Sequence, residues 1–287
     1  FIRKFNETVY REHPDAVTIA EESTAWQNVS RPTFTGGLGF GYKWDMGWMH
    51  DTLAFLTLDA KERPAHQNEL TFRALYAFSE NYMMPLSHDE VGRGQGSLWR
   101  QAPGDERQKM AALRLLFGYQ FAQPGKKLLF MGDEFGQRGA WNYEQALEWE
   151  RLSEPAHQGL KRWVRDLNRT YRHHECLHAR DCDPSGFEVI DFNNPGQCVV
   201  SFLRKGAGGE APAVVVCNFL PEARPAYRVG APLPGPWTAV LNSDADVYGG
   251  SCQGQPRVAT ENVSWNNRPQ SVLLDLPPLS IQVLMPV

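Results

Sequence analysis

The sequence predicts two architectures in one chain: an α/β region over residues 1–180, arranged as the C-terminal half of a (β/α)₈ barrel, and an antiparallel β-sandwich domain over residues 181–287. Three observations support this fold class. Short apolar segments alternate with helical patterns up to about residue 178, polar residues follow the end of each segment, and from Gly186 onward the pattern changes to period two. Strands that alternate with helices are typical of a parallel sheet with crossover connections.

Four short apolar segments in the first region are predicted to form strands. They cover residues 16–20, 39–44, 82–86 and 127–131, and the second is the weakest. A complete (β/α)₈ barrel has eight strands in about 250 residues. Four strands therefore predict half a barrel.

Helical periodicity separates these segments. Apolar residues at Ile2, Phe5 and Val9 form one face of a first helix, and a second helical stretch covers residues 68–78. The clearest helix ends at Pro124-Gly125; its apolar face is Met110, Leu113, Leu116, Phe117 and Phe121. The last helix carries Leu160, Trp163, Val164, Leu167 and Tyr171 on one face.

The second region has the pattern of an all-β domain. Strands are predicted over residues 187–192, 199–203, 213–219, 237–241, 271–276 and 281–285. Clusters of Pro and Gly separate them, which is typical of an antiparallel β-sandwich.

Composition excludes several classes of partner. The formal net charge of −4 argues against nucleic-acid binding, because phosphate contacts favour a basic excess. No apolar stretch is long enough to span a bilayer and no charge block suits a membrane surface, so no membrane partner is expected. The five cysteines include no Cys-x-x-Cys pair and no signal peptide is visible. We therefore expect free thiols and a cytoplasmic location.

Two acids follow predicted barrel strands, at positions suited to carbohydrate chemistry. Glu21 and Asp89 come after the first and third segments, and His88 precedes Asp89. Glycoside chemistry needs paired carboxylates, although surface acids are common and two strand-end acids alone are a weak signal. Sites for sugars combine flat aromatic rings with short polar groups. Aromatic residues in the adjacent sequence are Trp26, Tyr42, Trp44 and Trp48, of which the last three are our candidates for substrate contact.

Longer motifs around these residues resemble those of bacterial glycogen branching enzymes of the α-amylase superfamily. The matching stretches are Ala20-Glu21-Glu22-Ser23-Thr24, residues 36–44 and 47–53, Pro85-Leu86-Ser87-His88-Asp89-Glu90, residues 125–132, and Tyr171-Arg172-His173-His174. The resemblance covers nearly the whole chain. Residues 20–24 and 36–44 resemble the third signature region of the superfamily, residues 47–53 belong to the same stretch, and the motif at residues 85–90 resembles the fourth region.

The resemblance implies a reaction and a role for each residue. Such enzymes cleave an α-1,4-glucan, hold the released chain covalently on an aspartate and transfer it to a 6-hydroxyl, which forms an α-1,6 branch with retention. Glu21 would be the general acid/base, Asp89 the transition-state stabiliser and His88 a donor to sugar hydroxyls. Glu22 competes for the acid role, but Glu21 occupies the position of the family's glutamate.

The sequence departs from the family in two places. The nucleophile of these enzymes lies in a Gly-Phe-Arg-x-Asp motif, which is absent here, as is the first signature region. We therefore expect the missing N-terminal half of the same enzyme to be a partner, and this chain to be inactive alone. After Val91, Arg93-Gly94-Gln95-Gly96 stands where the family commonly has a basic pair.

Other functions stay open at this point. The alternatives are a non-catalytic glucan-binding fragment and another α-1,4-glucan hydrolase of the superfamily. The segment His174-Glu175-Cys176-Leu177-His178 also matches the zinc-protease pattern His-Glu-x-x-His. It lies at the end of a predicted helix and is followed by β-type sequence, so we expect no metal ligands there and no cofactor. His66 and His157 are expected on the surface.

Overall fold

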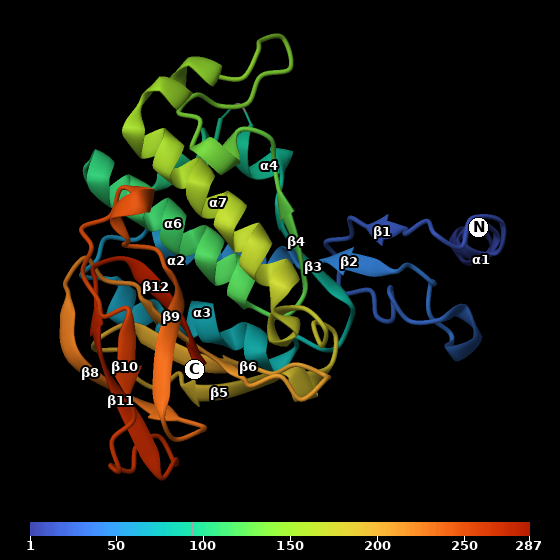
Figure 1. Cartoon of the computed structure of the whole chain (residues 1–287). Helices are drawn as coiled ribbons and strands as arrows, with labels where there is room; N and C mark the ends of the chain where they lie inside the picture. Colours follow the sequence, from blue (N-terminus) through green and yellow to red (C-terminus); the bar gives the residue numbers. More distant parts are fainter. Residues whose placement is uncertain (93) are drawn as a thin grey trace.

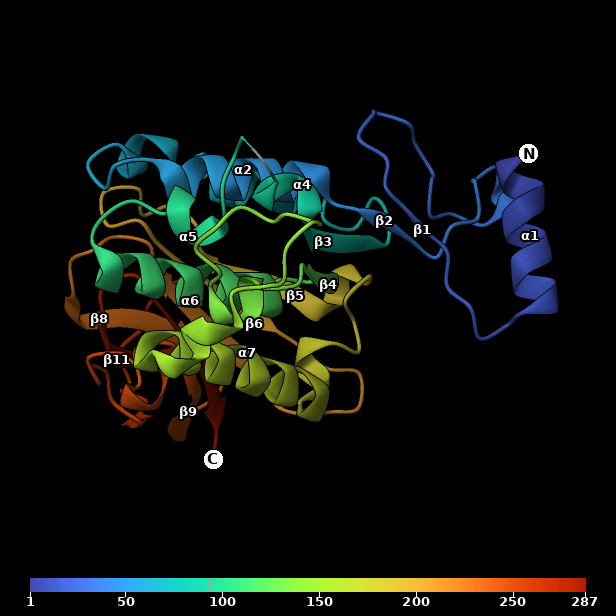
Figure 2. The same ribbon diagram turned by 90° about the horizontal axis from the view of Figure 1, so that it is seen from above.

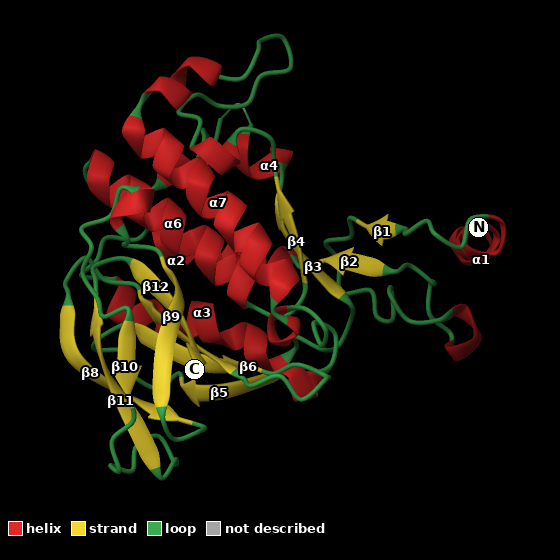
Figure 3. Ribbon diagram, viewed as in Figure 1, coloured by secondary structure: helices red, strands yellow, loops and turns green. Residues whose placement is uncertain are grey.

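The computed structural model describes residues 1–92 and 94–287. It contains one parallel sheet and two antiparallel sheets. Helices gather around the parallel sheet, and the antiparallel strands fill the other end of the molecule (Figure 3).

Four parallel strands form the first sheet in the order β1-β2-β3-β4. They are β1 (Ile19–Ala20), β2 (Tyr42–Trp44), β3 (Tyr82–Leu86) and β4 (Lys126–Leu129). Each lies within or close to a segment predicted from the sequence, but β1 and β2 are shorter than expected. Their parallel pairing places the carboxyl ends of all four at one edge.

Helices between and after these strands supply the core on one face of the sheet. The longer ones are α2 (Met46–Thr57), α6 (Glu106–Ala122) and α7 (Pro155–His173), and the short ones are α3 (Gln67–Thr71), α4 (His88–Val91) and α5 (Leu98–Gln101). Asp105 caps α6 through the backbone N–H of Gln108, whose side chain bonds back to Asp105 N. No helix in the described part of the chain is long and apolar enough to cross a membrane.

The chain before β2 (Tyr42–Trp44), which includes α1 and β1, extends as an arm from the body of the molecule (Figure 2). Its helix α1 (Ile2–Glu12) begins and ends close to prediction, but the predicted apolar face is not covered: Ile2 is 43% and Phe5 45% exposed. Instead Asn6 is buried, and its side-chain amide donates to Leu38 O. The buried carboxylate of Glu80 accepts the backbone N–H groups of residues 29 and 30, each at 2.8 Å, and thereby anchors the arm.

The antiparallel region contains a six-stranded and a two-stranded sheet. The six-stranded sheet has the order β10-β9-β12-β7-β6-β5, and the two-stranded sheet pairs β11 with β8. The strands are β5 (Phe187–Asp191), β6 (Val199–Arg204), β7 (Ala213–Asn218), β8 (Arg224–Ala231), β9 (Pro236–Asn242), β10 (Arg257–Ala259), β11 (Gln270–Leu276) and β12 (Ser280–Pro286). All six predicted strands are present. β8 and β10 were missed.

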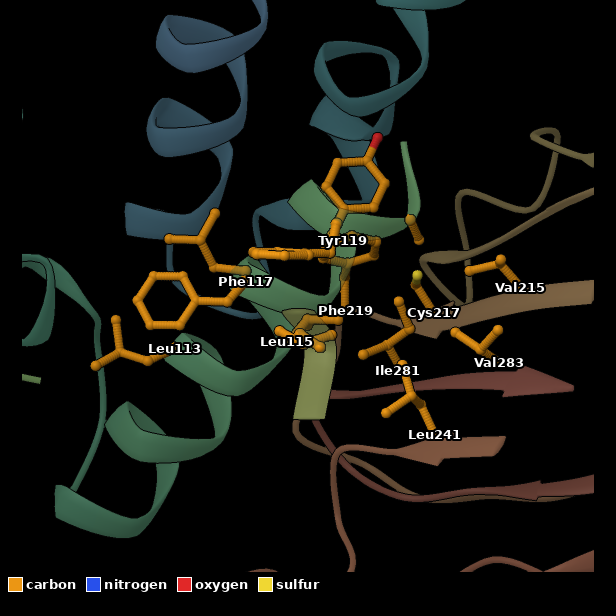
Figure 4. Packing of buried hydrophobic residues seen from close by; sticks show 14 of the residues in the cluster. Leu113, Leu115, Phe117, Tyr119, Val215, Cys217, Phe219, Leu241, Ile281 and Val283 are labelled. Atoms are coloured by element: carbon orange, nitrogen blue, oxygen red, sulfur yellow. The ribbon is translucent and has the colours of Figure 1, made fainter. Parts of the chain in front are cut away.

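The six-stranded sheet is covered on both faces. One face packs against β8 and β11 through Val214, Val216 and Leu274. The other packs against α6, whose Leu115 and Tyr119 belong to one hydrophobic cluster with Phe219, Ile281 and Val283 (Figure 4). Strands β6, β7 and β12 are consequently buried on both sides, which differs from the half-exposed strands that period two predicts.

The two regions therefore share one hydrophobic core, and buried arginines add polar contacts between them. Arg63 donates to Phe219 O at 2.6 Å, and Arg114 to Ser243 O at 2.7 Å. In Figure 1 helices α6 and α7 lie beside β9 and β12.

Candidate active site

The two acids singled out in the sequence lie at the same edge of the parallel sheet. Glu21 directly follows β1, and Asp89 stands three residues after the end of β3. Because β1, β2 and β3 run parallel, both acids are at the carboxyl edge, where parallel α/β folds bind their ligands. Both side chains are exposed.

Only one of the two acids that follow β1 contacts a charged side chain of the sheet. Met84 of β3 packs into the helix-facing core, and the register places Lys43 on that face of the sheet and Trp44 on the other. The pairing of β1 with β2 continues this alternation. Glu22, two residues after the end of β1, lies beside Lys43. The Nζ atom of Lys43 lies 2.8 Å from Oε2 of Glu22.

Glu22 is held as a carboxylate by its surroundings. Burial opposes its charged form, but the hydrogen bonds from Lys43 and Thr24 outweigh burial and lower the pKa of Glu22. Lys43 also donates to Thr24 O, and Thr24 N donates to Glu22 Oε1 at 2.7 Å. A general acid needs a proton at the working pH, so this arrangement disfavours Glu22 in that role. Glu21 accepts no hydrogen bond or ion pair from residues 1–92 and 94–287.

A capping box presents His88 and Asp89 to solvent. Ser87 caps α4, and the carboxylate of the buried Glu90 accepts both the N–H and the hydroxyl of Ser87. His88 and Asp89 retain side-chain exposures of 47% and 54%, and His88 Nε2 lies 3.3 Å from Asp89 Oδ1. The buried pair Ser87 and Glu90 thus fixes the backbone that carries the exposed pair.

An aromatic cluster from the loop after β4 lies beside His88. The ring centroid of His88 is 6.1 Å from Phe130 and 6.4 Å from Trp141. Trp141 N donates to Val91 O at 2.8 Å, which fastens this loop to the end of α4. Sequence reasoning missed Trp141, although it sits in a loop-like stretch of the kind that made the earlier tryptophans candidates.

The three predicted aromatic contacts have different positions. Trp44 is half-buried on the face of β2 opposite Lys43. Tyr42 is on the same face but two residues nearer the start of the strand, where burial raises its pKa and Asp181 and Lys126 are its charged neighbours. The prediction for Trp48 is wrong: its side chain is 2% exposed and belongs to the core beneath α2, so no ligand can stack on it.

Two further acids near the strand ends, Asp45 and Asp133, are buried. Asp45 caps α2 through Trp48 N, and its Oδ2 lies 2.7 Å from the buried Arg73. Asp133 is buried, and burial together with Glu134 raises its pKa, which favours its neutral form. Neither carboxylate lies free at the strand edge to act as a nucleophile.

The histidines differ from expectation in one case. His66 is exposed on its side chain, but His157 is buried, and its Nδ1 contacts Phe135 O at 2.7 Å. The His-Glu-x-x-His segment is not one α-helix: α7 ends at His173, and a 3₁₀ turn (Glu175–Leu177) follows. His174 bonds to Glu210 rather than facing His178.

One group of possible metal ligands occurs in the described residues, namely Glu106, Glu154 and His157, with ligand atoms within 4.8 Å of one another. The guanidinium of Arg138 bonds to both carboxylates there. Arg138 thus supplies the positive charge that a metal ion would otherwise bring to these two carboxylates. The segment Arg93-Gly94-Gln95-Gly96 stands where the family commonly has a basic pair. Arg93 lies outside the described residues, and Gly94 and Gln95 are exposed.

Comparisons with known proteins bear on the family and the fold of the chain. Residues 189–287 match the family described as alpha amylase, C-terminal all-beta domain. Two solved structures share the fold over almost the whole chain: an α-amylase from H. orenii (TM-score 0.62, 15% identity, 98% of this chain and 55% of that one) and a protein from Thermus thermophilus (TM-score 0.65, 17% identity, 100% and 56%).

Much more similar sequences occur among curated proteins. The chain is 53% identical over 287 residues to the 1,4-alpha-glucan branching enzyme of Cereibacter sphaeroides, covering 100% of this chain and 39% of that protein. It is 53% identical over 282 residues to the enzyme of the same name from Aquifex aeolicus, covering 98% and 45%. The chain thus spans about two fifths of the length of these relatives. It belongs to the family of bacterial 1,4-alpha-glucan branching enzymes and corresponds to their C-terminal part.

Proposed function

We propose that the protein containing this chain is a 1,4-α-glucan branching enzyme. It cleaves an α-1,4-glucan and transfers the released chain to a 6-hydroxyl by a retaining double displacement, which builds the branches of glycogen. The names of its relatives support this activity, and the exposed acids at one edge of the sheet suit it.

Glu21 is the general acid/base of the proposed site, Asp89 stabilises the positive charge that develops on the sugar, and His88 donates to a sugar hydroxyl. The ion pair between Lys43 and Glu22 carries this assignment, because it holds Glu22 as a carboxylate and leaves Glu21 as the candidate acid. Trp44 and Tyr42, on the face of β2 opposite Lys43, are the proposed stacking surfaces for glucose rings.

We further infer that the four-stranded parallel sheet is the second half of a (β/α)₈ barrel, that the chain divides near residue 180 and that a β-sandwich follows. The alternation of parallel strands and helices supports the first inference, and the two packed antiparallel sheets support the last. Strands β1 and β4 form the edges of the described sheet. The N-terminal half of the same enzyme, with the nucleophile, would pair with them. The free thiols suit a cytoplasmic location.

The test is a pair of substitutions in the full-length enzyme. Glu21→Gln is expected to lower branching about 10²–10⁴-fold, because a neutral amide cannot donate the proton to the leaving oxygen, while glucan binding is retained. Glu22→Gln is the matched control, and it should keep most of the activity while lowering the melting temperature through loss of the Lys43 ion pair. An active Glu21→Gln enzyme beside an inactive Glu22→Gln enzyme would show that the acid has been assigned one residue too early.

The same assay separates branching from hydrolysis. A branching enzyme shifts the iodine spectrum of amylose without a matching rise in reducing ends. An α-1,4-glucan hydrolase instead produces reducing ends in proportion to the loss of colour.

A further inference from the structure

The helix that carries His88 and Asp89 is too short to be stable by itself. A helix leaves its last four carbonyl groups without partners inside the helix, and α4 has only four residues. In Figure 1, α4 lies beside the end of β4, where the strand register pairs Leu86 with Leu129. The positions of His88 and Asp89 therefore depend on the contacts that α4 makes with other segments.

Two segments supply hydrogen-bond partners for the carbonyl groups at the end of α4. The side-chain amide of Gln101, the last residue of α5, donates to Glu90 O at 2.7 Å. The backbone N–H of Trp141, in the loop after β4, donates to Val91 O at 2.8 Å. The orientation of α4 thus follows from how α5 and this loop are placed relative to each other.

Arg138 joins α5 to the loop after β4. Its carbonyl oxygen accepts the hydroxyl of Ser97 at 2.8 Å, and Ser97 is the buried residue that caps α5 through Arg100 N. Its guanidinium carbon lies 4.7 Å from the ring centroid of Trp99, close enough for a cation–π attraction. One residue of the loop therefore contacts α5 through both its backbone and its side chain.

The guanidinium of Arg138 is also anchored to two longer helices. It donates to the carboxylate of Glu106, in the first turn of α6, and to that of Glu154, directly before α7, at 3.2 Å. The side chain of Arg138 is only 24% exposed, so these bonds are partly shielded from solvent. Arg138 thereby fixes α5 and the loop relative to α6 and α7.

A second acid holds the backbone at Arg138. Glu148 accepts Gly139 N at 2.9 Å and Arg138 N at 3.2 Å. Burial opposes the charge of Glu148, but the hydrogen bonds from Arg151 and from these two N–H groups outweigh burial and lower its pKa. The loop thus has a fixed conformation at residues 138 and 139, and Trp141 follows two residues later.

We propose that Arg138 is a positioning residue for the reaction: it holds α5 and the Trp141 loop in the arrangement that orients α4, and with it His88 and Asp89. The proposal rests on the proposed function, because the roles of His88 and Asp89 are assigned there. A misplacement of about 1 Å can cost an enzyme about a hundredfold in rate, whereas partly exposed ion pairs contribute little to stability. Loss of Arg138 should therefore affect turnover more than folding.

The test is Arg138→Met in the full-length enzyme, which removes the charge and the hydrogen-bond donors of the side chain. We expect kcat for branching to fall about tenfold or more, while KM for amylose and the melting temperature change little. Arg138→Lys should restore only part of kcat, because an ammonium group lacks the planar fork that bonds two carboxylates and stacks on a ring. Arg165→Met is the matched control and should leave kcat unchanged, since Arg165 forms an ion pair of 2.8 Å with its neighbour Asp166 on α7.

A second measurement follows His88 itself, without substrate. The full-length enzyme is labelled with ¹³C in its histidine rings, and the signal of His88 is identified by its loss in His88→Gln. Arg138→Met is expected to shift this signal and to leave that of the exposed His50 in place. Glu106→Gln, which weakens one anchor of the guanidinium from an exposed position, should shift the His88 signal less and lower kcat less.

Three results would overturn the proposal: an unchanged kcat in Arg138→Met, an equal loss of kcat in Arg165→Met, or a loss of kcat with an unmoved His88 signal. If Arg138→Met does not fold, Glu106→Gln decides, and wild-type kcat together with an unmoved His88 signal in that variant would likewise reject the role. The ring signal does not depend on branching. A shifted His88 signal in an enzyme that only hydrolyses amylose would leave Arg138 as a positioning residue and remove the proposed function, whereas normal branching with an unmoved signal would do the opposite.

Discussion

Adjacent residues of identical type have different surroundings here. Glu21 and Glu22 both follow β1, yet only Glu22 forms an ion pair with Lys43. That contact fixes the charge of Glu22. The choice between the two acids could be made from the sequence only through the family motif, whereas the ion pair supplies an independent physical reason to prefer Glu21 as the acid.

The tryptophans show the limit of residue-level reasoning. Trp44 and Trp48 stand four apart in similar sequence, and both looked suited to sugar contact. Helix α2 begins between them, so Trp44 ends a strand at the site edge while Trp48 turns into the core. Asp45, the cap that marks the start of α2, was the available signal.

Asp181 gives a prediction at the same scale. It is buried, lies 2.7 Å from Arg204 and 3.1 Å from Lys126, and also accepts from the hydroxyl of Tyr171. Burial opposes its ionisation, but Lys127 and Arg204 outweigh burial and lower its pKa. Asp181→Asn should therefore lower the free energy of unfolding at pH 7 by about 3–5 kcal/mol, the usual cost of breaking a buried pair.

The pH dependence follows from the sign of the shift. A depressed folded-state pKa adds stability above the unfolded value of about 3.9, and that stability is lost as the pH falls through the folded value. Urea unfolding at a series of pH values should show the gap between wild type and Asp181→Asn narrowing only at acid pH. Asp15→Asn, at an exposed turn, is the control and should show little change at any pH. A gap that stayed constant down to about pH 3 would contradict the ion-pair account.

Among the elements, α6 joins the two regions. Its boundaries were predictable because the signals are local: the capping box at Asp105 and the stop at Pro124-Gly125. The second face of α6, which packs against the antiparallel region, was not predictable from the sequence. Twelve of its residues are buried, which a single apolar stripe does not predict, because α6 is covered by α7 on one side and by β12 on another.

Gly118 of α6 permits this close packing and can be tested. In an exposed helix, Gly→Ala stabilises by about 1 kcal/mol. Here a Cβ would lie 2.4 Å from Ile281 Cγ2 and 3.0 Å from the ring of Trp163. Gly118→Ala should therefore lower the melting temperature instead of raising it, as measured by circular dichroism. Arg107→Ala on the exposed start of α6 should change it little, and a stabilised Gly118→Ala protein would refute the packing argument.

Strands β8 and β10 show why sequence patterns failed in the second region. β8 contains Pro225 and Gly230, and Ala226 has a positive φ of 51°. Such residues argue against a central strand, but β8 pairs only with β11 in the described part of the chain and so tolerates them at an edge. β10 has three residues, too few to show a period.

For the molecule as a whole, the main expectation concerns activity. The Gly-Phe-Arg-x-Asp motif of the family does not occur in these 287 residues, and a retaining enzyme needs a carboxylate nucleophile to form its covalent intermediate. The purified 287-residue chain should accordingly leave the iodine spectrum of amylose unchanged. Branching by a preparation whose intact mass shows only this chain would overturn that expectation and require a nucleophile from the acids present.

The arrangement at the scale of the molecule was predictable in outline. Patterns along the sequence predict four parallel strands followed by an antiparallel, β-rich region. They also predict the edge of the sheet that carries Glu21 and Asp89. They do not predict the shared core, because contacts such as Arg114 with Ser243 join residues more than a hundred positions apart and leave no local signature.

That shared core also limits how the chain can be rearranged. The antiparallel region cannot be exchanged independently of the rest of the chain, because β7 and β12 pack against side chains of α6. A chimera that took residues 181–287 from a distant relative would inherit strands shaped for another helix. Exchange between branching enzymes should succeed only when α6, α7 and β12 are transplanted as a set, because these elements pack against one another.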